Sequence, residues 1–140
     1  MEKKIFRKLL KSNDVGSTGS HQSGIHIPKS QKELISFLPV LDISIKNPSL
    51  FFKCIDDDNL EWKFRYIYYN NKFHDENGTR DEFRITQISS FFKSKVAQQN
   101  DIFEISKYIN KRYYNVKIIK NNYQDITNKP IKLKGWSKVF

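Results

Sequence analysis

Hydrophobic and polar residues alternate along several short stretches of this chain, and such alternation predicts β-strands. The clearest case is Glu61–Tyr69, in which one face is aromatic and the other face carries Lys63 and Arg65. The aromatic residues of this stretch are Trp62, Phe64, Tyr66 and Tyr68. The other predicted strands are Lys4–Leu10, Gly24–Ile27, Leu50–Ile55, Glu82–Ile88, Ile102–Ser106 and Tyr114–Lys120. Strands rich in aromatic and β-branched residues are typical of a sheet that covers a hydrophobic core.

The pattern between these strands predicts loops and a short helix. Ser30 followed by Glu33 is a capping-box pattern, and it predicts a helix that ends near Pro39. The polar, glycine-containing segments Ser12–Ser23 and Asn70–Gly78 predict loops.

Many short strands without a repeating strand–helix–strand rhythm predict a mainly β fold. We expect an open antiparallel barrel of about seven strands with one or two short helices. A chain of 140 residues suits one domain. We predict that residues 1–128 form this domain and that residues 129–140 are a basic tail or the start of a linker, with Trp136 as a possible anchor.

Composition narrows the classes of partner. Hydrophobic residues make up 38% of the chain, which is enough for a core, and the net charge of +10 favours phosphate or anionic lipid as a partner. Charge alone identifies no ligand, and a merely soluble surface stays an alternative. No apolar run approaches the roughly 20 residues that span a bilayer, and no apolar segment follows the basic Met1–Lys11 as in a signal peptide. The single Cys54 forms no internal disulfide, so we expect a cytoplasmic protein that does not bind membranes.

Catalytic and metal-binding patterns have little support in this sequence. The three histidines lie too far apart for a structural zinc site; they are His21, His26 and His74. Gly16–Gly19 lacks the lysine of a phosphate-binding loop. Asp56–Asp58 could hold a divalent ion, although such a run more often forms a solvated turn. Because no nucleophile, base and orienting acid occur together, we predict no catalysis, cofactor or metal for this chain.

Two segments carry side chains suited to nucleic-acid recognition. Ser12–Gly24 is dense in short polar residues, and its Asn, Gln and Asp side chains match the hydrogen-bonding edges of adenine and cytosine. Its glycines allow the backbone to approach another surface closely. In Thr79–Thr86, an extended backbone places Arg80, Glu82 and Arg84 on one face, and arginine suits the two acceptors of guanine. By composition alone, a flexible loop is the favoured interpretation of the first segment. For the second segment, an exposed strand face with alternating charges is as acceptable as recognition.

The order of several motifs resembles the N-terminal effector domain of EcoRII-type restriction endonucleases. The shared features are Ser12–Pro28, with Asn-Asp-x-Gly-x-Thr-Gly-x-His-Gln at Asn13–Gln22, then Asn47–Ser49, Ile67–Asn70, and Thr-Arg-x-Glu-x-Arg-Ile-Thr at Thr79–Thr86. They span roughly Leu9 to Lys120. The resemblance implies a DNA-binding pseudobarrel, related in fold to the B-three domains of plant transcription factors. In that fold two arms grip the duplex and reach into its major groove.

The resemblance also implies the residues and the target. The DNA-binding residues predicted for the two arms are Asn13, Asp14, Ser17, Thr18, Ser20, His21, Gln22, Thr79, Arg80, Asp81, Glu82, Arg84 and Thr86. The family recognises a short CCWGG-like sequence, in which W is A or T. Its metal-dependent nuclease domain is separate, so we expect a non-catalytic chain that partners double-stranded DNA and a linked or separate nuclease.

Other functions remain open at this point. Similar pseudobarrels serve as targeting domains of McrBC-like or modification-dependent restriction systems. A small nuclease is a second alternative. An RNA-binding barrel is a third, because aromatic residues such as Trp62 and Tyr66 would stack on bases if they were exposed. A protein-interaction barrel is disfavoured by the strong positive charge.

Overall fold

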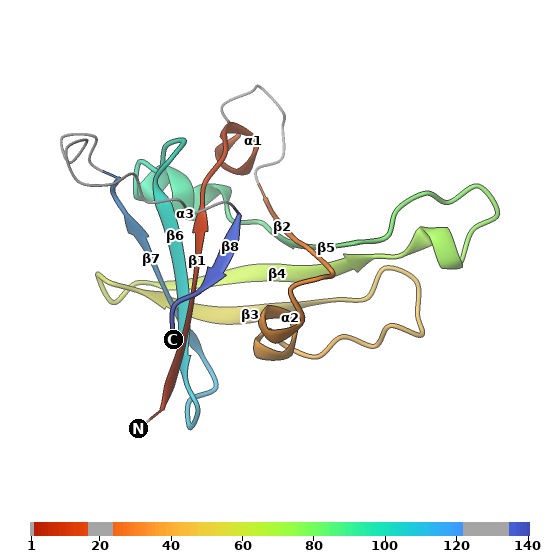
Figure 1. Ribbon diagram of the computed structural model, residues 1–140, viewed down its shortest axis with the longest axis horizontal. Coiled ribbons are helices and arrows are strands. Elements are labelled where there is room, and N and C mark those ends of the chain that lie inside the picture. The colour runs from red at the N-terminus through yellow and green to blue at the C-terminus, as the bar shows by residue number, and fades with distance from the viewer. Residues whose placement is uncertain (1, 17–23, 122–134) are drawn as a thin grey trace.

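The computed structural model describes residues 2–16, 24–121 and 135–140 of the chain. One curled sheet contains eight strands in the order β2-β5-β4-β3-β7-β6-β1-β8 (Figure 1). The strands are β1 Lys3–Leu9, β2 Ile25–Ile27, β3 Ser49–Asp56, β4 Glu61–Tyr69, β5 Glu82–Thr86, β6 Ile102–Tyr108, β7 Tyr114–Ile119 and β8 Trp136–Lys138. The helical elements are α1 Ser12–Val15, α2 Lys32–Phe37, the 3-10 turn η1 Asn71–Phe73 and α3 Ser89–Ser94. The predicted mainly β fold is confirmed.

A single parallel pairing joins the two halves of the sheet. Cys54–Asp56 of β3 pairs in parallel with Tyr114–Val116 of β7, whereas the other paired strands run antiparallel. In Figure 1 the half made of β2, β5, β4 and β3 crosses the half made of β7, β6, β1 and β8. The crossing encloses the core between the two halves.

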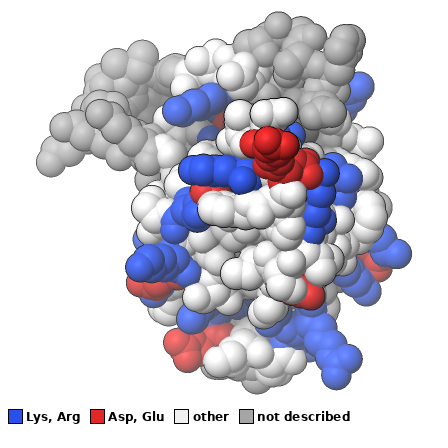
Figure 2. Space-filling view, turned by 90° about the vertical axis from the view of Figure 1, so that its right-hand side faces the viewer, with Lys and Arg blue, Asp and Glu red and all other residues white. Residues whose placement is uncertain are grey.

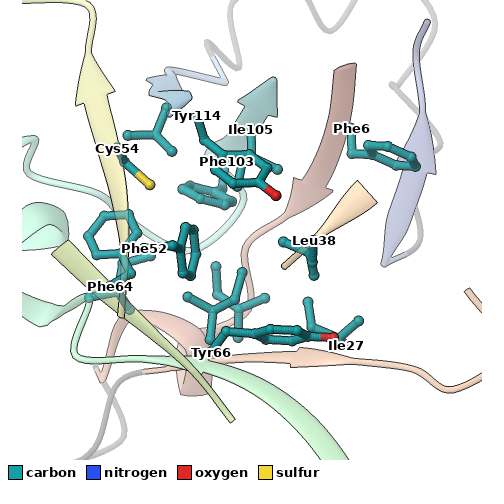
Figure 3. Close-up of a cluster of buried hydrophobic side chains, with 14 of the residues drawn as sticks. Phe6, Ile27, Leu38, Phe52, Cys54, Phe64, Tyr66, Phe103, Ile105 and Tyr114 are labelled. Atoms are coloured by element: carbon teal, nitrogen blue, oxygen red, sulfur yellow. The ribbon is translucent and has the colours of Figure 1, made fainter. Parts of the chain in front are cut away.

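The core is rich in aromatic side chains contributed by both halves. Phe64, Tyr66 and Tyr68 of β4 are buried, as the alternation predicted, while Lys63 and Arg65 point to the other face. Figure 3 shows side chains such as Phe52 and Tyr114 meeting in one cluster. The ring centroids of that pair lie 5.3 Å apart in an edge-to-face arrangement, which is a preferred geometry for aromatic packing.

Local helical turns differ most from the sequence prediction. The helix predicted from Ser30 begins at Lys32, with Gln31 as its N-cap and no side-chain cap hydrogen bond, so the capping-box prediction was wrong. The pattern did not predict α1 or α3. Each is one or two turns long, too short for a helical period to show, and α3 forms because Phe91 and Phe92 are buried in the core.

The C-terminal stretch contributes a strand to the sheet. Residues 136–138 form β8, which pairs with β1, and the Trp136 side chain is buried. The Trp136 indole N–H donates to the carbonyl of His26 at 2.9 Å. This part of the predicted tail therefore belongs to the same sheet as the rest of the domain. Within the described residues, no helix is long and apolar enough to span a bilayer.

Candidate nucleic-acid interface

A polar surface lies on the outward-facing side of β2, β5 and β4, which we call the outer face. On β5, Phe83 and Ile85 point into the core while Glu82, Arg84 and Thr86 point outward. Strand pairing sets their neighbours: Arg84 lies opposite His26, Glu82 opposite Tyr69, and Thr86 opposite Arg65. The extended backbone predicted for Thr79–Thr86 therefore exists from Glu82 to Thr86, where alternate residues face solvent, whereas Arg80 lies in the loop before the strand.

Two arginines flank one carboxylate at the edge of this face. The Arg80 guanidinium forms an ion pair with Glu82 at 2.5 Å, and Arg84 lies 3.9 Å from the other Glu82 oxygen. The Arg80 guanidinium carbon also lies 3.6 Å from the centroid of the Tyr69 ring, in a cation–π contact. The Arg80 side chain is 44% exposed. These contacts hold guanidinium donors at the surface while leaving some of them accessible.

A third arginine extends the outer face along β4. The Arg65 Nε–H donates to the Thr86 hydroxyl at 2.9 Å, and its Nη2 approaches the Tyr69 hydroxyl at 3.4 Å. Sequence reasoning missed Arg65 and Tyr69 as site residues. The signal was partly present, because the alternation placed Arg65 on the polar face of its strand. The register that sets β4 beside β5 is a tertiary fact, and only this register adds Arg65 to the cluster.

The root of the N-terminal segment packs directly on β5. A Cβ atom built on Gly24 would lie 3.1 Å from the Ile85 carbonyl oxygen, 3.5 Å from Arg84 Nη2 and 3.6 Å from a Thr86 methyl carbon. The absence of a side chain at Gly24 thus permits this close approach. The two segments chosen from the sequence, far apart along the chain, meet at this point.

Asp14 is buried at the base of the N-terminal segment. Its carboxylate accepts hydrogen bonds from the buried Lys8 ammonium at 2.5 Å and from the Lys11 backbone N–H at 2.8 Å. Asp14 therefore fixes α1 against β1, and a base contact by this residue stays a prediction. Asn13 is exposed on α1. The remaining predicted residues of this segment lie outside the described residues; they are Ser17, Thr18, Ser20, His21 and Gln22.

His26 adds a weakly basic group to the outer face. Its side chain is exposed on β2 opposite Arg84. Partial burial is the largest cause that lowers the pKa of His26, and the nearby Arg84 and Lys8 charges add to this effect, while Glu82 opposes it. The lowered pKa favours a neutral imidazole, which can both donate and accept a hydrogen bond.

The loop between β4 and β5 is fixed at its base by backbone and amide contacts. Buried Asn70 donates its side-chain amide to the Ile45 carbonyl at 2.9 Å and accepts from the Asn47 N–H at 2.6 Å. Asn71 accepts from the Arg80 N–H at 2.8 Å. Gly78 packs so closely that a Cβ atom would lie 2.1 Å from the Asn71 carbonyl oxygen. The loop therefore has a defined shape that sets the position of Arg80.

Thr79 and Asp81 differ from their neighbours in this loop. Thr79 is exposed, whereas the Asp81 carboxylate accepts from the Tyr68 hydroxyl at 2.5 Å and from the Lys29 ammonium at 3.0 Å. Burial and the Asp81 hydrogen bond raise the pKa of Tyr68 to about 12. The same hydrogen bond and Lys29 lower the pKa of Asp81. Asp81 therefore ties the loop to the segment after β2, and its predicted role at DNA remains a prediction.

Basic side chains spread over the end of the molecule that carries this loop. Figure 2 views that end and shows Lys and Arg side chains at several places on the surface, with smaller acidic groups between them. Such a mixed surface with a positive excess attracts a polyanion and retains acidic groups that can orient arginines.

The acidic run Asp56–Asp58 has a structural role in the described chain. Its carboxylates lie within 4.8 Å of one another, and the Lys95 ammonium contacts them at 3.2, 3.3 and 2.5 Å. Burial opposes ionisation of Asp56, but hydrogen bonds from the Trp62 indole, from two backbone amides and from Lys95 outweigh it and lower its pKa to about 2. This run forms the turn between β3 and β4, and the Lys95 ammonium neutralises part of its negative charge.

Two sequence comparisons show which family this chain resembles. The sequence model of a family described as "Restriction endonuclease EcoRII, N-terminal" matches residues 1–101. The type II restriction enzyme EcoRII of Escherichia coli is 35% identical over 85 residues, which cover 59% of this chain and 20% of that protein. The chain thus spans about a fifth of the length of this relative.

A solved structure supports the fold assignment. The Arabidopsis FUS3–DNA complex contains a chain that matches with a TM-score of 0.64 and 22% sequence identity. The match covers 85% of this chain and 99% of the other. It confirms the predicted pseudobarrel architecture.

Proposed function

This chain belongs to the family of EcoRII N-terminal domains, and from that membership we propose that it binds duplex DNA sequence-specifically as the non-catalytic recognition domain of a restriction system. The similar protein from Escherichia coli is a type II restriction enzyme, and this chain spans about a fifth of its length. Any cleavage then comes from another domain or chain. A CCWGG-like duplex is the first target to test, and a cytoplasmic location remains a prediction.

One observation carries the proposal: the last residue of the N-terminal polar segment packs on the strand that carries the second polar segment. Gly24, at the root of the N-terminal segment, packs on Arg84 and Thr86, and the Arg80–Glu82–Arg84 cluster continues the same surface. Guanidinium groups supply paired donors suited to guanine in the major groove.

The residues divide into two roles under this proposal. Arg80 and Arg84 present donors to base edges, and Glu82 either orients them or accepts from a cytosine amine. Arg65 lies next to them along β4 and suits a backbone phosphate, which fixes the register of a protein on DNA without reading sequence. Thr86 and Tyr69 hold Arg65 and Arg80 in place.

The direct test selects duplexes from a random pool and then compares Arg80→Ala with wild type. We expect Arg80→Ala to lose about 10- to 100-fold in preference for the selected duplex, because one bidentate contact contributes about 1–3 kcal/mol of discrimination. Arg112→Ala is the matched control, since Arg112 is exposed on the turn between β6 and β7. Equal losses by Arg80→Ala on selected and random duplexes would exclude direct readout by this residue. A pool that yields no preferred sequence would overturn the proposed function itself.

The rival functions are separated by two further assays. Cleavage of plasmid by this chain with magnesium would show a nuclease. A competition assay between duplex DNA and single-stranded RNA tests the RNA-binding alternative, which predicts that the RNA displaces the DNA. The structure weakens that rival, because Tyr66 is 1% exposed and packs in the core, so it offers no stacking surface. Repeating the selection with methylated duplexes distinguishes a modification-dependent system.

A further inference from the structure

One edge of β3 is only partly covered in the described chain. β4 pairs with β3 along Ser49–Ile55, while β7 pairs with the opposite edge only at Cys54–Asp56. No other strand of the described ranges lies on that opposite edge. The Ser49–Lys53 part of β3 therefore presents an open backbone edge.

The register shows which backbone groups face this open edge. Asp56 donates to the Leu60 carbonyl and Tyr68 donates to the Pro48 carbonyl, so the even-numbered residues of β3 bond toward β4. In an antiparallel ladder the alternate residues turn their N–H and C=O groups the other way. Phe51 accordingly turns both groups toward the open edge, and Lys53 turns its N–H toward it.

A groove of about 640 Å³ runs along this edge. Leu50–Lys53 form one wall, and residues 109–112 of the turn between β6 and β7 form the other. In Figure 1 this turn extends below β3, beyond the place where β7 meets that strand. The groove lies along the edge of β3 that faces away from β4. Phe51 pairs with Arg65 in the β3–β4 register, so the groove borders the outer face, whereas Arg84 lies one strand further away on β5.

The chemistry of the groove combines apolar and positive groups. Phe51 and Ile109 are large hydrophobic side chains with exposed fractions of 56% and 68%. Four basic residues line the groove, and none of its lining residues is acidic; the basic residues are Lys53, Lys107, Lys111 and Arg112. Only Lys53 among these four has a carboxylate partner in the described chain, the exposed Glu61 at 3.0 Å.

We propose that this groove binds an extended acidic peptide segment, which adds to β3 as a further strand. An open strand edge supplies main-chain donors and acceptors for such an addition, and neighbouring side chains select the sequence. The exposed Phe51 and Ile109 fit apolar side chains of the segment, and the four cations fit its carboxylates. A nucleic-acid strand would use the cations and would stack a base on Phe51, but it would leave the Phe51 backbone groups and the Ile109 side chain unpartnered.

The test is a titration of ¹⁵N-labelled chain with the peptide acetyl-Glu-Val-Glu-Leu-Glu-Val-Glu-amide, followed by NMR. We expect amide shift changes concentrated in Ser49–Lys53 and in residues 107–112, together with slower hydrogen exchange of the Phe51 amide. The same peptide with N-methyl groups on alternate amides should bind at least about tenfold more weakly, because it lacks the main-chain donors. Arg112→Glu should also weaken binding at least about fivefold through charge repulsion. Lys93→Glu, an exposed change on α3, should leave binding within about twofold of wild type.

Three results would overturn this proposal. They are the absence of shift changes at millimolar peptide, equal binding of the N-methylated peptide, and shift changes that map outside the groove. A single-stranded oligonucleotide that shifts the groove amides while the peptide does not would assign the groove to nucleic acid instead. The proposed duplex recognition is tested separately, because its test uses Arg80, which does not line the groove.

Discussion

At the residue scale, a buried ion pair supports the N-terminal segment. We expect Lys8→Met to destabilise the domain by about 3–5 kcal/mol, because the Asp14 carboxylate would keep its burial and lose its cation. Urea unfolding measures this change. The double variant Lys8→Met/Asp14→Asn should recover part of the loss, since the Asn oxygen can still accept from the Lys11 N–H. A Lys8→Met variant as stable as wild type would show that the pair contributes nothing to folding.

Tyr69 is a second residue whose role is testable. Its ring lies under the Arg80 guanidinium, and an exposed cation–π contact contributes about 0.5–1 kcal/mol. If Arg80 reads DNA, Tyr69→Leu should reduce discrimination about two- to fivefold, whereas Tyr69→Phe should retain it because the ring remains. Binding assays on selected and random duplexes measure both. If Tyr69→Leu and Tyr69→Phe discriminated equally well between the duplexes, the Tyr69 ring would have no role in recognition.

At the element scale, the loop between β4 and β5 depends on one glycine. Gly78→Ala places a Cβ atom 2.1 Å from the Asn71 carbonyl oxygen, so the loop must rearrange. We expect faster hydrogen exchange of the Arg80 amide, whose acceptor is Asn71, and weaker DNA discrimination without global unfolding. Asn77→Ala, at an exposed neighbouring position, is the control and should leave exchange unchanged. Unchanged exchange in Gly78→Ala would mean that the close packing does not fix the loop.

At the scale of the whole molecule, stability should fall in acid. Asp56 has a folded-state pKa of about 2, below its value of roughly 3.9 in an unfolded chain. A lowered pKa stabilises the fold above pH of about 4, and this contribution is lost as pH falls from about 4 to about 2. In the Asp56→Asn variant, the urea concentration at the midpoint of unfolding should therefore change less with pH between about 2 and about 4 than it does in wild type.

The matched control for this pH effect is Asp57→Asn, which removes the same charge from an exposed neighbour. It should keep the wild-type shape of the curve. If the urea midpoint of Asp56→Asn changed with pH as steeply as that of wild type, other carboxylates would be the cause of the acid sensitivity.

The sequence determined the parts of the fold that depend on local pattern. Alternation along Glu61–Tyr69 predicted both the strand and its buried aromatic face, because side chains of a strand point to opposite sides in turn. Polarity and glycine content marked the N-terminal segment of the candidate interface. The Arg80, Glu82 and Arg84 grouping followed from the same period of two.

Only the tertiary structure decided which strands lie together, and this pairing depends on contacts between residues far apart in the chain. The β4–β5 register added Arg65 and Tyr69 to the outer face. Tertiary contacts gave Asp14 and Asp81 partners within the protein, which their short polar side chains did not reveal. Core packing of Trp136 brought the C-terminal residues into the sheet. Local sequence specifies which face a side chain occupies, whereas the neighbours on that face are set by long-range pairing and by burial of the common core.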